Sequence, residues 1–132
     1  MAKNKIVCDT DVMIDYWDIS SKRHIQTKTI LEEKIGLDNI YLSAITKMEL
    51  LMGARNKSEE TTISKRLKVL LDNAITIEAL HLFENYRLSH GIAIPDCLIA
   101  STTKVLDAEL FTYKIKDFKF ISKLKLFDIS AT

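Results

Sequence analysis

Short apolar segments alternate with helical patterns along nearly the whole chain. The predicted strands occupy residues 4–9, 39–44, 74–77, 108–113 and 123–129. The predicted helices occupy residues 11–18, 22–36, 45–55, 58–71, 79–89 and 95–106. Strands that alternate with helices build βαβ units, in which helices cover both faces of a parallel sheet. The pattern therefore predicts an α/β fold, a three-layer α/β/α sandwich around a mainly parallel central sheet.

The length and composition of the chain are those of one globular domain. It has 132 residues, of which 47% are hydrophobic and 28% charged, which separates it from disordered chains. No apolar run reaches the roughly 18 residues of a membrane span, and Asp9 and Asp11 interrupt what could be a signal-peptide core. The two cysteines, Cys8 and Cys97, are expected to fill the core in a reducing compartment. We therefore expect a single domain, residues 1–132, located in the cytoplasm.

The net charge of +1 argues against the global basic field that marks many nucleic-acid-binding proteins. Lysines are nevertheless concentrated near the C-terminus, where residues 113–125 contain five of them and a single acid, Asp117. Such a segment is either an ordinary solvated surface or an edge that contacts phosphate groups. The sequence leaves both interpretations open.

Four acidic residues fall after predicted strands or at a helix start. Asp9 and Asp117 come after strands, and Glu49 lies in the helix that follows a strand. Asp96 follows Pro95 in the first turn of its helix, where the positive end of the helix dipole favours an anion. Right-handed crossovers bring the carboxyl ends of parallel strands to one edge, where open α/β folds bind their ligands. We therefore expect the four carboxylates to meet at this edge.

Each acid alone also has an ordinary structural explanation. Asp96 would be a favourable charge at a helix start. Glu49 would be a boundary residue beside Ile45, Met48 and Met52, whose helical spacing predicts a buried stripe. Taken together, however, converging carboxylates raise one another's pKa values and destabilise the fold unless a cation is present. Oxygen-only ligands favour Mg²⁺ or Mn²⁺ over zinc.

Other reaction chemistries find little support in the sequence. His24, His81 and His90 show no zinc-ligand spacing with one another or with the cysteines. The chain contains no G-x-G-x-x-G, no Walker-type phosphate loop and no G-x-S-x-G nucleophile motif. Dinucleotide binding, P-loop chemistry and α/β-hydrolase chemistry are therefore not expected.

Four segments resemble those of one protein family, in the family's order. They are "VCDTDVMIDY", "LSAITKMELLMGA", "GIAIPDCLIASTTKVLDAELFTY" and "KIKDFKFISKLKLF". The first is similar to the opening strand and D-T-[ND]-x-x-I-[DE] turn of PIN-domain ribonucleases, and the second to the segment that carries their glutamate. The third resembles their P-D-x-L-I-A helix and the fourth their closing D-F segment. The chain thus resembles the PIN-domain family over nearly its whole length, most closely a VapC-type toxin of a toxin–antitoxin pair.

The resemblance implies a metal-dependent endoribonuclease with Mg²⁺ or Mn²⁺ as cofactor. Carried over residue by residue, Asp9, Glu49, Asp96 and Asp117 are the expected catalytic and metal-binding residues. Hydrolysis by an activated water then leaves a 5′-phosphate and a 3′-hydroxyl on the RNA products.

Three further positions follow from the same motifs. Asp11 and Thr112 are expected as outer-shell residues, although Asp11 would alternatively only cap the following helix. Lys114 departs from the family pattern, because "TYKIKDF" stands where the family has T-x-N-x-x-D-F. A lysine there would either contact substrate phosphate or pair with Asp117 and weaken its metal role. The residues expected to contact RNA phosphates are Lys114, Lys116 and Lys119.

The resemblance also implies protein partners, namely a cognate antitoxin and a second copy of the chain in a homodimer. Two apolar stripes would form such a surface or would simply belong to the core. These stripes are Leu50, Leu51 and Ala54, and Leu67, Leu70 and Leu71.

Two alternative functions stay open. One is a PIN-like scaffold that binds RNA or protein with little or no cleavage, which the unusual Lys114 would favour. The other is a haloacid-dehalogenase-type phosphatase, because Asp9 and Asp11 resemble its D-x-D start. Met13, however, stands where that motif has Thr or Val, and no G-D-x-x-x-D segment follows.

Overall fold

A four-stranded sheet forms the centre of the fold. The computed structural model describes residues 5–53, 57–58, 61, 65 and 68–131. The strands lie in the order β3-β2-β1-β4, and every neighbouring pair is parallel. Their bounds are Ile6–Cys8 for β1, Ile40–Ser43 for β2, Lys68–Leu70 for β3 and Glu109–Phe111 for β4. Because all four strands run in the same direction, their carboxyl ends share one edge of the sheet.

Helical elements connect and follow these strands. They are α1 (Thr10–Trp17), α2 (His24–Thr29), η1 (Ile30–Ile35), η2 (Leu37–Asn39), α3 (Ala44–Met52), α5 (Asn73–His90), α6 (Ile94–Leu106), η3 (Ile115–Asp117) and η4 (Ile129–Ala131). α2 runs on directly into the π-helix η1, which ends at Gly36 with a φ of 88°, a value that glycine adopts without strain. Within the described residues, no helix has both the length and the apolar character needed to cross a membrane.

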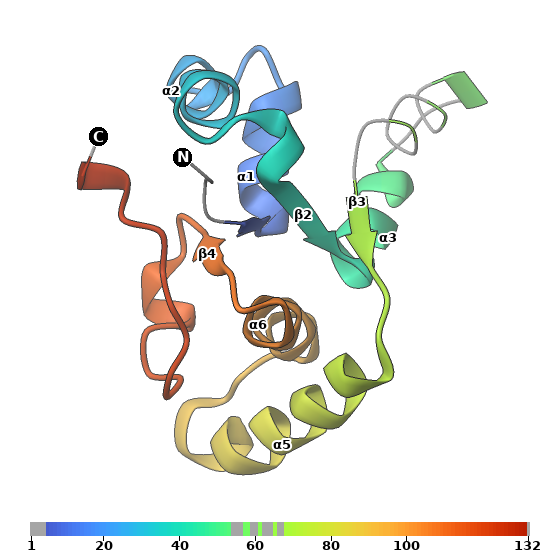
Figure 1. Ribbon diagram of the computed structural model, residues 1–132, viewed down its shortest axis with the longest axis vertical. Helices are drawn as coiled ribbons and strands as arrows, with labels where there is room; N and C mark the ends of the chain where they lie inside the picture. Colours follow the sequence, from blue (N-terminus) through green and yellow to red (C-terminus); the bar gives the residue numbers. More distant parts are fainter. Residues whose placement is uncertain (1–4, 54–56, 59–60, 62–64, 66–67, 132) are drawn as a thin grey trace.

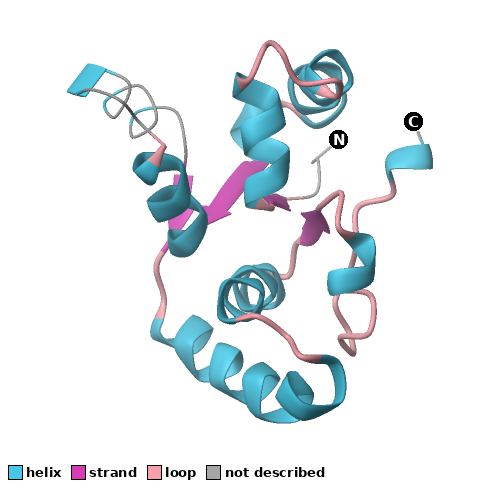
Figure 2. Ribbon diagram, turned by 180° about the vertical axis from the view of Figure 1, so that it is seen from behind, coloured by secondary structure: helices cyan, strands magenta, loops and turns pink. Residues whose placement is uncertain are grey.

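Two separate groups of apolar side chains pack against the two faces of the sheet. Ile6 and Cys8 of β1 face the side covered by α1, α2 and η1, whereas Val7 faces α5 and α6, since successive strand residues point to opposite faces. Figure 1 and Figure 2 show the sheet between these two groups of helices. The architecture is therefore the predicted three-layer α/β/α sandwich with a parallel central sheet.

The region between α3 and α6 differs most from the sequence prediction. Residues 74–77 were expected as a strand, but they form the first turns of α5, where the Asp72 side chain accepts a hydrogen bond from the backbone N–H of Ala74. The strand lies earlier, at Lys68–Leu70, inside the predicted helix 58–71. Most of the rest of that predicted helix lies outside the described residues.

Two smaller predictions also need correction. Residues 123–129 do not form a full edge strand; they pair with β4 through a single parallel bridge between Leu126 and Leu110. On α3, the stripe predicted to be buried is largely exposed, with Met48 57% and Met52 86% accessible. The buried positions of this helix are instead Thr46 and Leu50. Helical periodicity predicted the helix correctly but selected the wrong face.

Candidate active site

The predicted site residues lie on segments that begin at the carboxyl edge of the sheet. Asp9 directly follows β1 and Thr112 directly follows the neighbouring β4. Glu49 lies in α3, which starts at the end of β2, and Asp117 ends η3, beyond β4. Asp96 lies in the first turn of α6. Because the strands are parallel, these residues lie on the same side of the molecule.

Asp9 is the most enclosed of the predicted acids, with only 1% of its surface exposed. Its Oδ1 accepts a hydrogen bond from the backbone N–H of Thr10 at 2.7 Å, so that Asp9 is the N-cap of α1. Its Oδ2 accepts a hydrogen bond from the hydroxyl of Thr112 at 2.8 Å and lies 3.8 Å from Nζ of Lys114. Contacts from two chain segments therefore fix the orientation of this carboxylate.

Glu49 is connected to the same turn through two threonines. The hydroxyl of Thr10 donates a hydrogen bond to Oε1 of Glu49 at 2.8 Å and lies 3.1 Å from Oγ1 of Thr46. The sequence analysis assigned no role to either threonine. Their positions carried a signal, however, because Thr10 adjoins Asp9 and Thr46 lies one helical turn before Glu49.

The charges of all the other predicted metal-binding acids affect the pKa of Asp96. Partial burial, the largest cause, raises its pKa to about 6. The ammonium of Lys114 lowers this pKa, and the remaining contributions, which raise it, come from Asp9, Asp117 and Glu49. The four acids therefore share one electrostatic environment.

Asp11 also belongs to this environment, although it does not cap α1. Its Oδ2 accepts a hydrogen bond from the backbone N–H of Tyr113 at 3.2 Å, whereas its Oδ1 is buried and has no hydrogen-bond partner among the described residues. Burial and the charge of Asp9 raise the pKa of Asp11 to about 6, against the lowering effects of Lys114 and of the backbone N–H groups of Tyr113 and Val12. A buried oxygen of this kind is costly unless a proton or a cation satisfies it.

Lys114 brings the positive charge of this region. Its backbone N–H donates a hydrogen bond to Oγ1 of Thr112 at 3.0 Å, and its carbonyl accepts one from the N–H of Asp117 at 2.9 Å. Partial burial lowers the pKa of its side chain, but nearby acids outweigh this effect and raise it; these are Asp9, Asp96, Asp11 and Asp117. The ion pair that Lys114 makes within the described chain is with Asp9 and not with Asp117, the partner considered from the sequence.

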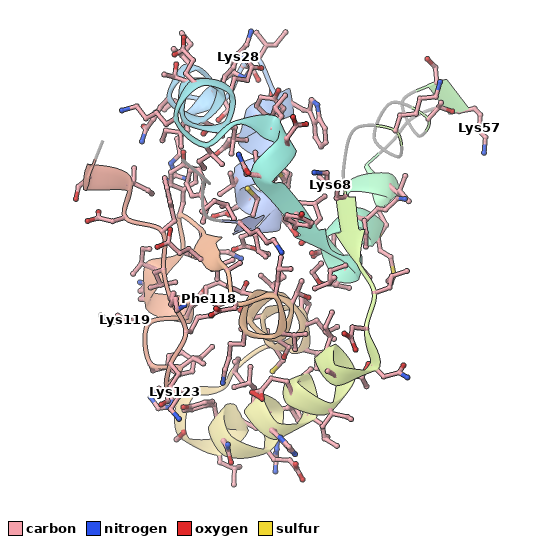
Figure 3. The ribbon with its side chains drawn as sticks, in the orientation of Figure 1. Lys28, Lys57, Lys68, Phe118, Lys119 and Lys123 are labelled. Atoms are coloured by element: carbon pink, nitrogen blue, oxygen red, sulfur yellow. The ribbon has the colours of Figure 1, made fainter. Side chains whose placement is uncertain are left out.

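The lysines labelled in Figure 3 lie on separate parts of the described chain. Lys116 and Lys119 are exposed on the segment after β4, which also carries Asp117. Figure 3 shows Lys119 and Lys123 on this segment, whereas three other labelled lysines lie on distant parts of the chain, Lys28, Lys57 and Lys68. The segment after β4 therefore places Lys116 and Lys119 on either side of Asp117 in the sequence.

The apolar stripes considered as partner surfaces divide between core and surface. Leu50 is buried, Leu51 and Leu70 are half-buried, and Leu71 is exposed. The other two members, Ala54 and Leu67, lie outside the described residues.

The carboxylates do not form a ready-made metal cage. In the part of the chain that the structure describes, no three His, Cys, Asp or Glu side chains are arranged to hold a metal ion together. The donor set nevertheless fits Mg²⁺ or Mn²⁺ in its chemistry, because it consists of carboxylate oxygens and includes the unpartnered Oδ1 of Asp11. A divalent cation would also relieve the repulsion that contributes to the raised pKa values of Asp11 and Asp96.

Comparison with protein families identifies the class of protein. The model of the PIN domain family matches residues 6–123. The chain therefore belongs to the PIN domain family, which confirms the resemblance seen in its motifs. A comparison with curated proteins gives no significant match.

Several solved structures have the same fold. A toxin–antitoxin complex from Klebsiella pneumoniae is 22% identical, with 91% of this chain and 95% of that chain covered and a TM-score of 0.69. VapBC-1 from nontypeable Haemophilus influenzae is 24% identical, with coverages of 95% and 98% and a TM-score of 0.69. DNA-bound VapBC from Salmonella typhimurium is 21% identical, with coverages of 96% and 98% and a TM-score of 0.73. At these identities, the likeness shows a shared fold over nearly the whole of each chain.

Proposed function

We propose that the protein is a Mg²⁺-dependent endoribonuclease and the toxin of a toxin–antitoxin pair, acting as one domain over residues 1–132. Its membership of the PIN domain family supports this proposal. The observation that carries it is the position of the four acids on segments that begin at the carboxyl edge of the sheet, where Thr112 holds the buried carboxylate of Asp9. Several carboxylates placed in this way are suited to a divalent cation.

In this proposal Asp9 and Asp96 hold the cation, with help from Glu49 and Asp117. When bound, Mg²⁺ or Mn²⁺ supplies positive charge beside the scissile phosphate and makes a water more acidic. The chain itself orients the carboxylates, since Thr112 donates a hydrogen bond to Asp9 and Thr10 donates one to Glu49. A water oriented between these carboxylates would attack the phosphorus in line and give a proton to a carboxylate, while the bond from phosphorus to the 3′ oxygen breaks and that oxygen leaves as the 3′-hydroxyl.

The proposed substrate is single-stranded or loop RNA, whose backbone can enter an acidic site more readily than a rigid duplex. Lys116 and Lys119, exposed beside Asp117, would contact its phosphates, and Lys114 would join them when it leaves Asp9. Such contacts predict that RNA binding weakens as salt concentration rises. The proposed site of action is the cytoplasm, where RNA substrates are present.

The proposed protein partners are a cognate antitoxin and a second copy of the chain. Similar folds occur in solved toxin–antitoxin complexes, which supports the first partner. Large apolar side chains are exposed on several helices, which supports a covered surface in the assembled state. They include Met48, Met52, Ile77, Leu80 and Leu88. Co-expression with the adjacent gene product, followed by light scattering, tests both partners, and a monomer under all conditions would contradict them.

A second candidate function is an RNA- or protein-binding scaffold without cleavage. One observation favours it: the ammonium of Lys114 lies 3.8 Å from Asp9 and neutralises part of the acidic charge. Membership of the PIN domain family speaks against the third alternative, a haloacid-dehalogenase-type phosphatase.

An RNA-cleavage assay separates the two remaining candidates. Purified protein is incubated with a mixture of structured and unstructured RNAs in Mg²⁺, in Mn²⁺, or with a chelator, and the product ends are then identified. The nuclease proposal predicts cleavage only with a divalent cation, and products with a 5′-phosphate and a 3′-hydroxyl. A 2′,3′-cyclic phosphate, or equal cleavage with the chelator, would contradict it; RNA binding without cleavage would favour the scaffold.

A further inference from the structure

The ammonium of Lys114 lies beside the buried carboxylate of Asp9. Its Nζ is 3.8 Å from Oδ2 of Asp9. The two partners differ in exposure, because 48% of the Lys114 side chain is accessible and only 1% of the Asp9 side chain. Asp9 is therefore a carboxylate held inside the protein, whereas the lysine approaches it from the solvent side.

The backbone of Lys114 is anchored to the same group. Its N–H donates a hydrogen bond to Oγ1 of Thr112, the hydroxyl of which donates to the same Oδ2 of Asp9. Its carbonyl accepts a hydrogen bond from the N–H of Asp117. The position of the Cα atom is thus set by the site, while the long side chain remains free to change direction.

We propose that Lys114 is a tethered counter-ion, which neutralises the acids in the metal-free protein and must move away when a divalent cation binds. This inference rests on the proposed metal site. The lysine carries a compact charge on a flexible stem, so that it can enter and leave without a backbone change. Its half-exposed side chain can turn toward solvent, where substrate phosphates would approach.

Competition of this kind has two opposite consequences. Without a cation, the lysine stabilises the fold, because it offsets the repulsion among buried and half-buried carboxylates. With a cation, the lysine weakens the observed affinity, because only the fraction of molecules with the lysine displaced is competent to bind. Removal of the charge should therefore weaken the metal-free protein and tighten cation binding in the same variant.

The test compares Lys114→Met, which removes the charge and adds no oxygen ligand, with Lys114→Arg, which retains the charge. Lys28→Met is the matched control, since Lys28 is an exposed lysine of α2 and Figure 3 shows it far from Lys119 and Lys123. Mn²⁺ affinity is measured by calorimetry, and the melting temperature is measured with a chelator present. Lys114→Ala provides the same comparison if Lys114→Met does not fold.

We expect Lys114→Met to bind Mn²⁺ about three- to tenfold more tightly than the unmodified protein, in line with a half-exposed ion pair. Its melting temperature in chelator should fall by about 2–5 °C, while Lys114→Arg and Lys28→Met should stay close to the unmodified protein in both measurements. An affinity for Mn²⁺ that is unchanged or weaker in Lys114→Met, or an unchanged melting temperature, would overturn the counter-ion role alone. If neither the unmodified protein nor Lys114→Met binds Mn²⁺, the proposed metal site is wrong as well.

Discussion

The polar side chains in the two halves of helix α6 differ in where their interaction partners lie. In its second half, the hydroxyls of Ser101, Thr102 and Thr103 are buried, and each donates a hydrogen bond to the carbonyl four residues earlier. In its first turn, the pKa of the half-buried Asp96 depends first on burial and then on charged residues from three other parts of the chain. The hydroxyls of the second half find their hydrogen-bond partners within a single helix. The electrostatic environment of Asp96 depends on segments that only the complete fold brings together.

The difference separates a structural region from a functional one. Hydroxyls that donate to the carbonyl four residues earlier are neutral and already hydrogen-bonded, so they require no ligand. Burial, followed by repulsion between the acids, raises the pKa values of Asp11 and Asp96, and Oδ1 of Asp11 has no hydrogen-bond partner among the described residues; both features cost stability in the metal-free protein. Substitutions in the two regions should therefore affect different measurements.

The largest expected effect is that of Asp9→Asn on RNA cleavage. The variant keeps one oxygen that accepts from the backbone N–H of Thr10, and its NH2 group can donate to the hydroxyl of Thr112, so the fold should be retained, but it loses the charge that would hold the cation. Cleavage should fall by more than about 100-fold, beyond the loss expected for a residue that only orients a ligand. The rate is measured in Mg²⁺, with circular dichroism as the check on folding. Thr102→Val, in the self-contained region, serves as the control, and a folded Asp9→Asn that still cleaves RNA would remove the metal proposal.

Thr112→Val should have a smaller effect on the same measurement. Its hydroxyl donates to Asp9 and accepts from the N–H of Lys114, so its loss leaves the carboxylate less well oriented. The expected decrease in cleavage rate is about 10- to 100-fold, as for groups that position a metal ligand. Thr103→Val makes the same chemical change in the other region and should leave the rate unchanged. Equal rates for the two variants would mean that Thr112 does not support the site.

The stability of the metal-free protein should depend on pH through the acids. The pKa of Asp96 in the folded protein is about 6, above its ordinary value of 3.8, so the folded state takes up a proton at a higher pH than the unfolded chain. The free energy of unfolding should therefore rise by about 1 kcal/mol as the pH falls from 7 to 5, a value reduced by screening at a half-exposed group. Urea unfolding in chelator at several pH values measures this change. Asp96→Asn should remove this part of the rise and leave the part that comes from Asp11, whose pKa is also about 6, and an unchanged profile in that variant would contradict the assignment.

The smallest effect is expected for Thr103→Val on stability. The hydroxyl donates to the carbonyl of Ile99, and its removal leaves an apolar side chain of similar shape in a buried position. The free energy of unfolding should change by less than about 1 kcal/mol, because replacing a satisfied hydroxyl by a methyl group leaves no buried donor unpaired. Denaturant unfolding measures the change. A loss above about 2 kcal/mol would show that this hydroxyl is less independent than its local hydrogen bond indicates.

The sequence predicted the parallel sheet between two layers of helices because the alternation of strands and helices is a local pattern. Strands ending in acids and the pair Pro95–Asp96 are readable from neighbouring residues alone. The strand predicted at 74–77 was wrong because β-branched residues there resembled a strand, whereas the cap at Asp72 and packing of α5 on α6 favour a helix. Three-residue strands such as β3 carry too few residues for a clear pattern.

The electrostatic details of the site were beyond the sequence for a different reason. The motif marked Lys114 as unusual, but only the fold brings its ammonium to Asp9, which lies more than a hundred residues earlier in the chain. The hydroxyl contact between Thr10 and Glu49 likewise joins two segments whose relative position depends on the whole sheet. Contacts between distant segments require the packing of the complete domain.

The central claim is that Asp9 and Asp96 hold one divalent cation between them. Anomalous diffraction from crystals of the protein grown with Mn²⁺ tests it most directly. The account predicts a single dominant peak or a close pair of peaks within about 2–2.5 Å of carboxylate oxygens of both residues, with the Lys114 ammonium moved away from Asp9. A Mn²⁺ peak only at another place in the protein, or no Mn²⁺ peak near Asp9 and Asp96, would contradict it.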